Sequence, residues 1–197
     1  MQFKAFEPGI EVLGKALEFT LAGFRIMPSM GMRYLTMHGL TRPGPDGKPT
    51  FDRDGWHSQQ AWLDAFRAIH DEVGSFTTFE MGRQLSLQGF SPAVPKEMHT
   101  AMVWLDMGYH VFHRKNGKVM GDPATGRMVE GIGHYGYKRE RDDKIVSVCQ
   151  NPYPCDFDFG LLSGTAERFE KRARVMHDDS APCRKKGADS CTYVITW

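Results

Sequence analysis

The fold of this chain depends most on one stretch, KIVSVCQNPYPCDFDFG, which spans residues 144–160. Its segment from Ile145 to Val148 is rich in β-branched residues, which favour strands. Residues 151–154, NPYP, can form neither a helix nor a central strand, because proline lacks the N–H donor and biases the preceding residue toward extended geometry. A helix is predicted next, because four apolar residues share one helical face: Phe159, Leu162, Ala166 and Phe169.

Further strands are predicted on both sides of this stretch. Upstream, residues 128–138 are expected to pair antiparallel with residues 144–149 across the charged turn 139–143. Downstream, short strands are expected around Val175 and from Cys191 to Trp197. The C-terminal part of the chain is therefore predicted to be a small β-rich module crossed by one helix.

Three helices are predicted before residue 113. The first follows a Ser58 cap and ends at Gly74, and its apolar residues are spaced by four, three and four: Trp62, Phe66, Ile69 and Val73. The second runs from about Phe76 to Leu87. The third spans residues 96–112, and its buried stripe is Met98, Met102, Leu105, Tyr109 and Phe112.

The predicted class is α+β, with a helical layer packed on a small antiparallel sheet and a C-terminal β-rich module closed by a four-cysteine metal site. A Pro- and Gly-rich loop at residues 41–49 divides the chain into an N-terminal extension, residues 1–50, and a ligand-binding domain, residues 51–197. The extension is a candidate for homodimerisation, since Met27, Met30 and Met32 look exposed.

Composition narrows the class of protein. The chain has 197 residues, and its 25 Lys and Arg nearly balance its 24 Asp and Glu, which argues against a nucleic-acid partner. No apolar run is long enough to span a membrane. The first eight residues include Glu7 and Pro8 where a signal peptide needs apolar residues, so we expect a cytoplasmic protein.

All four cysteines lie in the last quarter of the chain: Cys149, Cys155, Cys183 and Cys191. In a reducing compartment such residues seldom form disulfides. Two pairs on separate loops can close around one tetrahedral zinc ion, which is the predicted cofactor. An iron–sulfur cluster takes the same four thiolates and is the alternative. Inert core thiols, or a redox-active thiol pair, are the other readings.

Several of these residues together resemble the 4-vinyl reductase domain. They are NPYPC at residues 151–155, the Phe159-Gly160 pair, and Cys183-x3-Gly187-x3-Cys191-Thr192-Tyr193, and the similarity covers roughly residues 60–197. The resemblance implies a small-molecule or hydrocarbon-binding module, with heme-based nitric-oxide sensors and tethering subunits as relatives. It also implies a cysteine–carboxylate zinc site beside the effector pocket.

Two metal ligands follow directly from this resemblance, because Cys183 and Cys191 match the last two cysteines of that family. Where the related sensors have a carboxylate, this chain has Ser180, so the extra cysteine is the expected fourth ligand. His177, Asp178 or Asp179 could replace one cysteine. The family name implies a reductase, but no G-x-G-x-x-G motif is present to bind a nucleotide cofactor, so a binding module is expected rather than an enzyme.

The predicted ligand-binding residues are aromatic, Met and His side chains near the third helix and the following strand: Met102, Trp104, Tyr109, His134 and Tyr135. His134 could donate a hydrogen bond to a phenolic or carbonyl ligand. His110 and His113 lie three residues apart and could share a metal, but no carboxylate is spaced to join them.

The sequence thus predicts a sensor or carrier of a small apolar or aromatic ligand, with a structural zinc site. The alternative is a redox enzyme or accessory protein in which the cysteines hold an iron–sulfur cluster, or in which a tetrapyrrole occupies the cavity. A purely structural interaction protein is the third possibility.

Overall fold

The computed structural model describes residues 2–25, 27–89 and 97–197. It is a mixed α and β structure with antiparallel sheets, which confirms the predicted class. The α-helices are α1 Leu17–Gly23, α2 Pro28–Met37, α3 Gln59–Glu72, α4 Ser75–Gly89, α5 Met98–Val111 and α6 Cys155–Phe169, and the short 3-10 helices are η1 Gly14–Ala16 and η2 Arg184–Lys186. The strands are β1 Ile10–Leu13, β2 Arg42–Pro43, β3 Pro49–Thr50, β4 Trp56–Ser58, β5 His113–Lys115, β6 Lys118–Val119, β7 Gly121–Asp122, β8 Arg127–Met128, β9 His134–Tyr135, β10 Lys138–Arg141, β11 Lys144–Gln150, β12 Arg174–His177 and β13 Cys191–Thr196.

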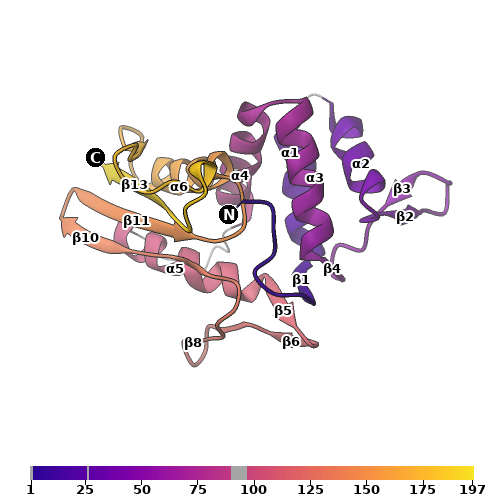
Figure 1. The fold of residues 1–197 in the computed structure, drawn as a ribbon, viewed down its shortest axis with the longest axis horizontal. Coiled ribbons are helices and arrows are strands. Elements are labelled where there is room, and N and C mark those ends of the chain that lie inside the picture. Colours follow the sequence, from indigo (N-terminus) through magenta and orange to yellow (C-terminus); the bar gives the residue numbers. More distant parts are fainter. Residues whose placement is uncertain (1, 26, 90–96) are drawn as a thin grey trace.

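The C-terminal sheet has the strand order β10-β11-β13-β12, with β9 also paired to β11. All of its pairings are antiparallel, and Cys149 of β11 lies opposite Cys191 of β13. Strand β13 alternates buried and half-buried residues, as expected for a strand with one face on the core. Figure 1 shows this sheet at one end of the molecule and α1, α2 and α3 at the other.

The predicted single strand over residues 128–138 is wrong, because the chain forms three short strands there, β8, β9 and β10. Gly131 and Gly133 interrupt it with φ values of 119° and 79°, a backbone region that residues with a side chain rarely adopt. A Cβ on Gly133 would also lie 1.9 Å from the carbonyl oxygen of Gln150. The glycines therefore allow this segment to lie against β11, and the same backbone conformations divide it into separate short strands.

The predicted helices are all present. Ser58 caps α3 by accepting a hydrogen bond from the N–H of Ala61 at 3.2 Å. The predicted start of the third helix at Lys96 lies outside the described residues, which show α5 from Met98. Helices α4 and α6 pack at backbone distance, since a Cβ on Gly82 or Gly160 would fall about 2 Å from a carbonyl oxygen of the facing helix.

Residues 1–50 contribute strand β1 and helices α1 and α2 to the same body. Strand β1 lies between β4 and β5 in a second antiparallel sheet, β4-β1-β5-β6, and α1 packs on α4. Residues of the expected loop 41–49 form the small β2–β3 hairpin seen at the edge of Figure 1. The division of the chain at residue 50, and dimerisation through the first segment, stay predictions.

Within the described residues, no helix combines the length and the apolar character needed to cross a bilayer. Met27 is exposed, whereas Met30 and Met32 are half-buried.

Candidate functional site

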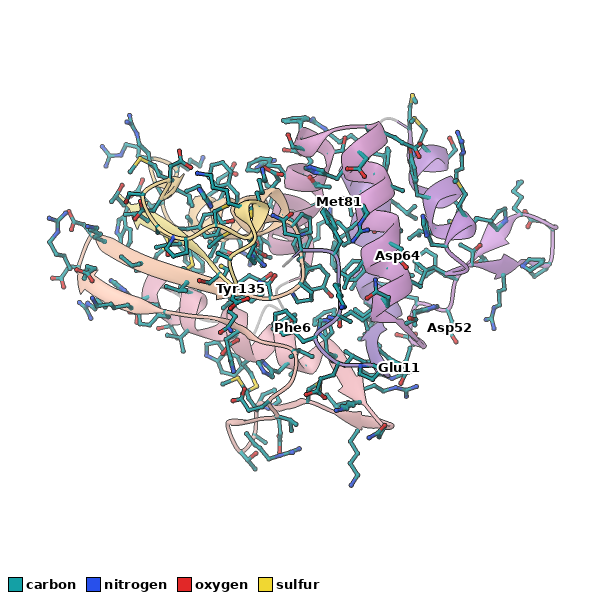
Figure 2. All side chains as sticks on the ribbon, in the orientation of Figure 1. Phe6, Glu11, Asp52, Asp64, Met81 and Tyr135 are labelled. Atoms are coloured by element: carbon teal, nitrogen blue, oxygen red, sulfur yellow. The ribbon has the colours of Figure 1, made fainter. Side chains whose placement is uncertain are left out.

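A cavity of about 280 Å³ lies between α3, α5, α6 and the strands β1, β5 and β9. Its walls are almost entirely apolar and aromatic. The lining residues are Val12, Ala16, Trp62, Leu85, Trp104, Leu105, Met107, Gly108, Tyr109, Val111, Phe112, His113, Pro123, Tyr135, Tyr153, Phe157 and Leu161. Tyr135, on strand β9 of the C-terminal sheet, lies near the centre of the molecule (Figure 2).

Each of the three lining tyrosines directs its hydroxyl proton to a partner within the protein. Tyr109 donates to the carbonyl oxygen of Ile132 at 2.7 Å, and Tyr135 donates to the Asp158 carboxylate at 2.7 Å. Tyr153 is 2.8 Å from Nε2 of His113. Burial raises the pKa of all three hydroxyls, so they remain protonated. The lining therefore presents ring surfaces and no free tyrosine proton.

His113 is held in one neutral tautomer. Its Nδ1 lies 2.7 Å from the carbonyl oxygen of Tyr109, which can only accept a hydrogen bond, so Nδ1 carries the proton. Its Nε2 then accepts from the Tyr153 hydroxyl. Burial lowers the pKa of His113 to about 4, because the charged imidazolium would be desolvated. At neutral pH the cavity therefore contains no charge from this residue.

Of the predicted ligand-binding residues, Trp104, Tyr109 and Tyr135 line the cavity, while Met102 and His134 are not among its lining residues. Met102 is buried in the core. The sequence reasoning missed Tyr153 and His113 as lining residues. Tyr153 stands in the NPYP loop, which the sequence marks only as excluded from helices and central strands, and His113 stands out in the sequence only through its spacing from His110.

His134 instead joins two elements. Its Nδ1 is 2.8 Å from Asp106 on α5, and its Nε2 is 3.1 Å from Glu130. The other carboxylate oxygen of Asp106 accepts the backbone N–H of Tyr135 at 2.9 Å. Burial lowers the pKa of His134, but the hydrogen bonds to the two carboxylates outweigh that effect and raise it overall. These contacts fasten β9, and with it the Tyr135 wall, to α5.

Three of the four predicted metal ligands converge. Cys155 begins α6, Cys183 ends the loop before η2, and Cys191 begins β13. Their Sγ atoms are 2.8 Å apart for Cys155 and Cys191 and 3.8 Å apart for the other two pairs. His177, at the end of β12, completes a group whose ligand atoms all lie within 4.8 Å of one another. We call these four residues the thiol cluster.

Cys149 is not part of this group. Its Sγ lies 3.7 Å from Oγ of Ser147, although its Cα is directly opposite Cys191 in the sheet. The four-cysteine set is therefore not assembled, and His177, one of the substitutes expected from the sequence, takes the fourth place. Metal binding by the thiol cluster stays a prediction.

Within the thiol cluster, the surroundings of Cys191 favour the deprotonated form of its thiol. The hydrogen bond from Cys155, together with Arg184, lowers the pKa of Cys191 below its ordinary value, against the effect of its burial. The backbone N–H and Nε of Arg184 donate to Cys191 Sγ at 3.3 and 3.5 Å. The arrangement favours a thiolate at Cys191 that accepts a hydrogen bond from the Cys155 thiol.

No family model matches this sequence, and no curated protein matches it. Its fold is similar to solved structures of H-NOX proteins. One from S. oneidensis in the Fe(II)NO ligation state is 14% identical with a TM-score of 0.57, covering 91% of this chain and 97% of that chain. One from K. algicida, in the Fe(II) unliganded state, is 10% identical with a TM-score of 0.60, covering 93% and 95%.

A third solved structure, described as probing heme distortion in the H-NOX family, is 14% identical with a TM-score of 0.59 and covers 94% of this chain and 95% of that chain. At such identities the likeness establishes the fold alone. It overturns the resemblance to the 4-vinyl reductase domain, because these structural neighbours are H-NOX proteins.

The zinc prediction, with the iron–sulfur cluster as its alternative, is wrong by the same comparison. The structural neighbours are described as Fe(II) and heme proteins, and neither zinc nor an iron–sulfur cluster is named among them. The resemblance misleads because short motifs, such as NPYPC and the spacing of Cys183 and Cys191, specify neither the fold family nor the bound ion.

Proposed function

We propose that this chain is a small-molecule sensing domain that binds a neutral, apolar ligand directly in the cavity. The observation that supports this proposal is the lining of the cavity. The hydroxyls of its three tyrosines and the ring of His113 are already hydrogen-bonded within the protein, so a ligand gains most from contact with rings and aliphatic side chains. Engineered apolar cavities of about 150 Å³ bind benzene. A cavity of about 280 Å³ accommodates a monocyclic hydrocarbon by the same physics.

Heme is the group that the fold neighbours suggest, and the described lining residues do not fit it. An axial ligand needs a free donor atom, but both nitrogens of His113, the imidazole in the lining, are hydrogen-bonded to protein groups. Heme also carries two propionates, and the described lining offers no Lys or Arg to pair with them. A volume of about 280 Å³ is small for a macrocycle of four pyrrole rings.

Thermal unfolding with toluene tests this function. A ligand that binds only the folded chain raises Tm by mass action, so Tm should rise with toluene concentration. Gly108 lines the cavity, and a Cβ added to it meets no atom within 4 Å. Gly108→Leu should therefore occupy part of the cavity and abolish the shift, whereas the matched control Gly108→Ala should keep it.

Two outcomes would contradict the proposal. An unchanged wild-type Tm at saturating toluene would show that the cavity does not bind apolar molecules. Heme added to the purified chain should give no visible absorption that stays with the protein. A stable heme complex with such absorption would contradict direct ligand binding and would favour heme-based sensing instead.

A further inference from the structure

A second group of candidate metal ligands lies between α5 and β9, separate from the thiol cluster. Asp106 and His110 are four residues apart on α5, so they share one face of that helix, and His134 contacts them from β9. One ligand atom of each residue lies within 4.8 Å of the ligand atoms of the other two. Two imidazoles and one carboxylate form a set that suits first-row transition-metal ions.

His110 has one ring nitrogen that the protein does not use. The side chain is completely buried, and its Nδ1 lies 2.8 Å from the backbone carbonyl oxygen of Asp106. Because a carbonyl oxygen only accepts hydrogen bonds, Nδ1 carries the proton and Nε2 carries a lone pair. This Nε2 is buried and has no hydrogen-bond partner among the described residues. Buried polar atoms are normally paired, so the unpaired nitrogen itself points to a bound ligand.

His134 has a similar division between its two nitrogens. Its ring lies beside the His110 ring, with 5.0 Å between the ring centroids. Its Nδ1 lies 2.8 Å from Oδ2 of Asp106, while its Nε2 lies 3.1 Å from the Glu130 carboxylate. Histidines that bind metals usually donate their second N–H to a carboxylate or a backbone carbonyl, which orients the ring. Both imidazoles of this group have such a partner on one nitrogen and can bind an ion through the other.

We propose that Asp106, His110 and His134 bind one divalent first-row transition-metal ion between α5 and β9. The ion takes the place of the hydrogen bond between Asp106 and His134, since ligand atoms give up their protons when they bind a metal. The other oxygen of Asp106 accepts the backbone N–H of Tyr135 at 2.9 Å, so the bound ion also fixes β9 against α5. This inference does not depend on the proposed ligand binding, because none of the three residues lines the cavity.

Equilibrium dialysis of the full chain against Co²⁺, after removal of metals with EDTA, tests this site. The number of Co²⁺ ions bound at saturation should be lower by one per chain in His134→Gln than in the wild-type chain. His57→Gln is the matched control and should bind as many ions as the wild-type chain. His57 is also half-buried, and it belongs to neither group of candidate ligands among the described residues. Any Co²⁺ at the thiol cluster cancels in this comparison, because its four residues are unchanged.

Two further measurements examine the site without removing a ligand. Glu130→Gln replaces a side chain that is 84% exposed, and it should weaken Co²⁺ binding by about tenfold, as expected for the loss of a group that orients a metal ligand. Hydrogen exchange at the Tyr135 amide should be slower with Co²⁺ in the wild-type chain and unaffected by Co²⁺ in His134→Gln. Thermal melting in EDTA shows whether each variant is folded.

Equal numbers of bound Co²⁺ ions in the wild-type chain and His134→Gln would overturn the proposal, as would a wild-type chain that binds no Co²⁺. If His134→Gln does not fold, Glu130→Gln decides the question. An unchanged Co²⁺ affinity in Glu130→Gln, together with an unchanged exchange rate of the Tyr135 amide in the wild-type chain, would then place the bound ions elsewhere and overturn the site.

Discussion

At the residue scale, His113 illustrates how burial fixes a protonation state. Its neutral ring donates to a backbone carbonyl and accepts from Tyr153, an arrangement that protonation of Nε2 would break. Burial lowers its pKa from the ordinary 6.5 to about 4, so between these values the unfolded chain binds a proton that the folded chain does not. Stability is therefore lost as pH falls through this window.

We expect this residue to account for a loss on the order of 3 kcal/mol between pH 6.5 and pH 4. Urea unfolding across that range should show a shallower pH dependence in His113→Gln, even though its stability at pH 7 is lower. Parallel curves for the wild-type chain and His113→Gln would refute the assignment.

The thiol cluster carries a second prediction at this scale. Three soft sulfur donors and one imidazole form a ligand set that suits a soft metal ion, so we expect Cys155, His177, Cys183 and Cys191 to bind one such ion per chain. Elemental analysis of the purified protein should find it, and Cys183→Ser should lose it. Cys149→Ser is the control and should retain the ion, and retention by Cys183→Ser would remove Cys183 from the set.

At the scale of elements, the contact between β9 and α5 depends on His134. Its side chain is 32% exposed, and two carboxylates favour its charged form. Because the pKa is raised in the folded chain, this stabilisation is fully present below the ordinary value of 6.5 and is lost as pH rises through the folded-state pKa. Hydrogen exchange at the Tyr135 amide should therefore accelerate from pH 6 to pH 8 by more than the intrinsic rate increase.

His134→Gln should remove that extra pH dependence, since glutamine does not titrate. Asp106→Asn should weaken it as well, because the amide no longer attracts the imidazolium. An extra acceleration that survives both substitutions would show that another group controls the contact.

At the scale of the whole molecule, β1 ties the first fifty residues to the rest. It lies between β4 and β5, so a chain beginning at residue 51 leaves both strands without their shared neighbour. It also loses Leu17 and Leu35, which are fully buried. We expect circular dichroism of such a chain to show no cooperative melting, and a melting curve like that of the full chain would support an independent domain 51–197.

Several features could be predicted from the sequence alone. The apolar spacing from Trp62 to Ile69 and the Ser58 cap placed α3, and the β-branched run from Ile145 to Val148 placed β11. These predictions succeeded because helix and strand periodicity depend on neighbours a few residues apart. The α+β class followed from the order of those elements.

Only the tertiary structure decided the rest, because it depends on contacts between residues far apart in the chain. Tyr153 meets His113 across 40 positions, and Gln150 lies against Gly133, which breaks a strand that looked continuous. The sequence determined that cysteines gather in one module, but the folding of β12 beside β13 brought His177 to the thiol cluster and left Cys149 outside it. The sequence shows which residues could contribute to a site, whereas the packing of the elements determines which of them come into contact.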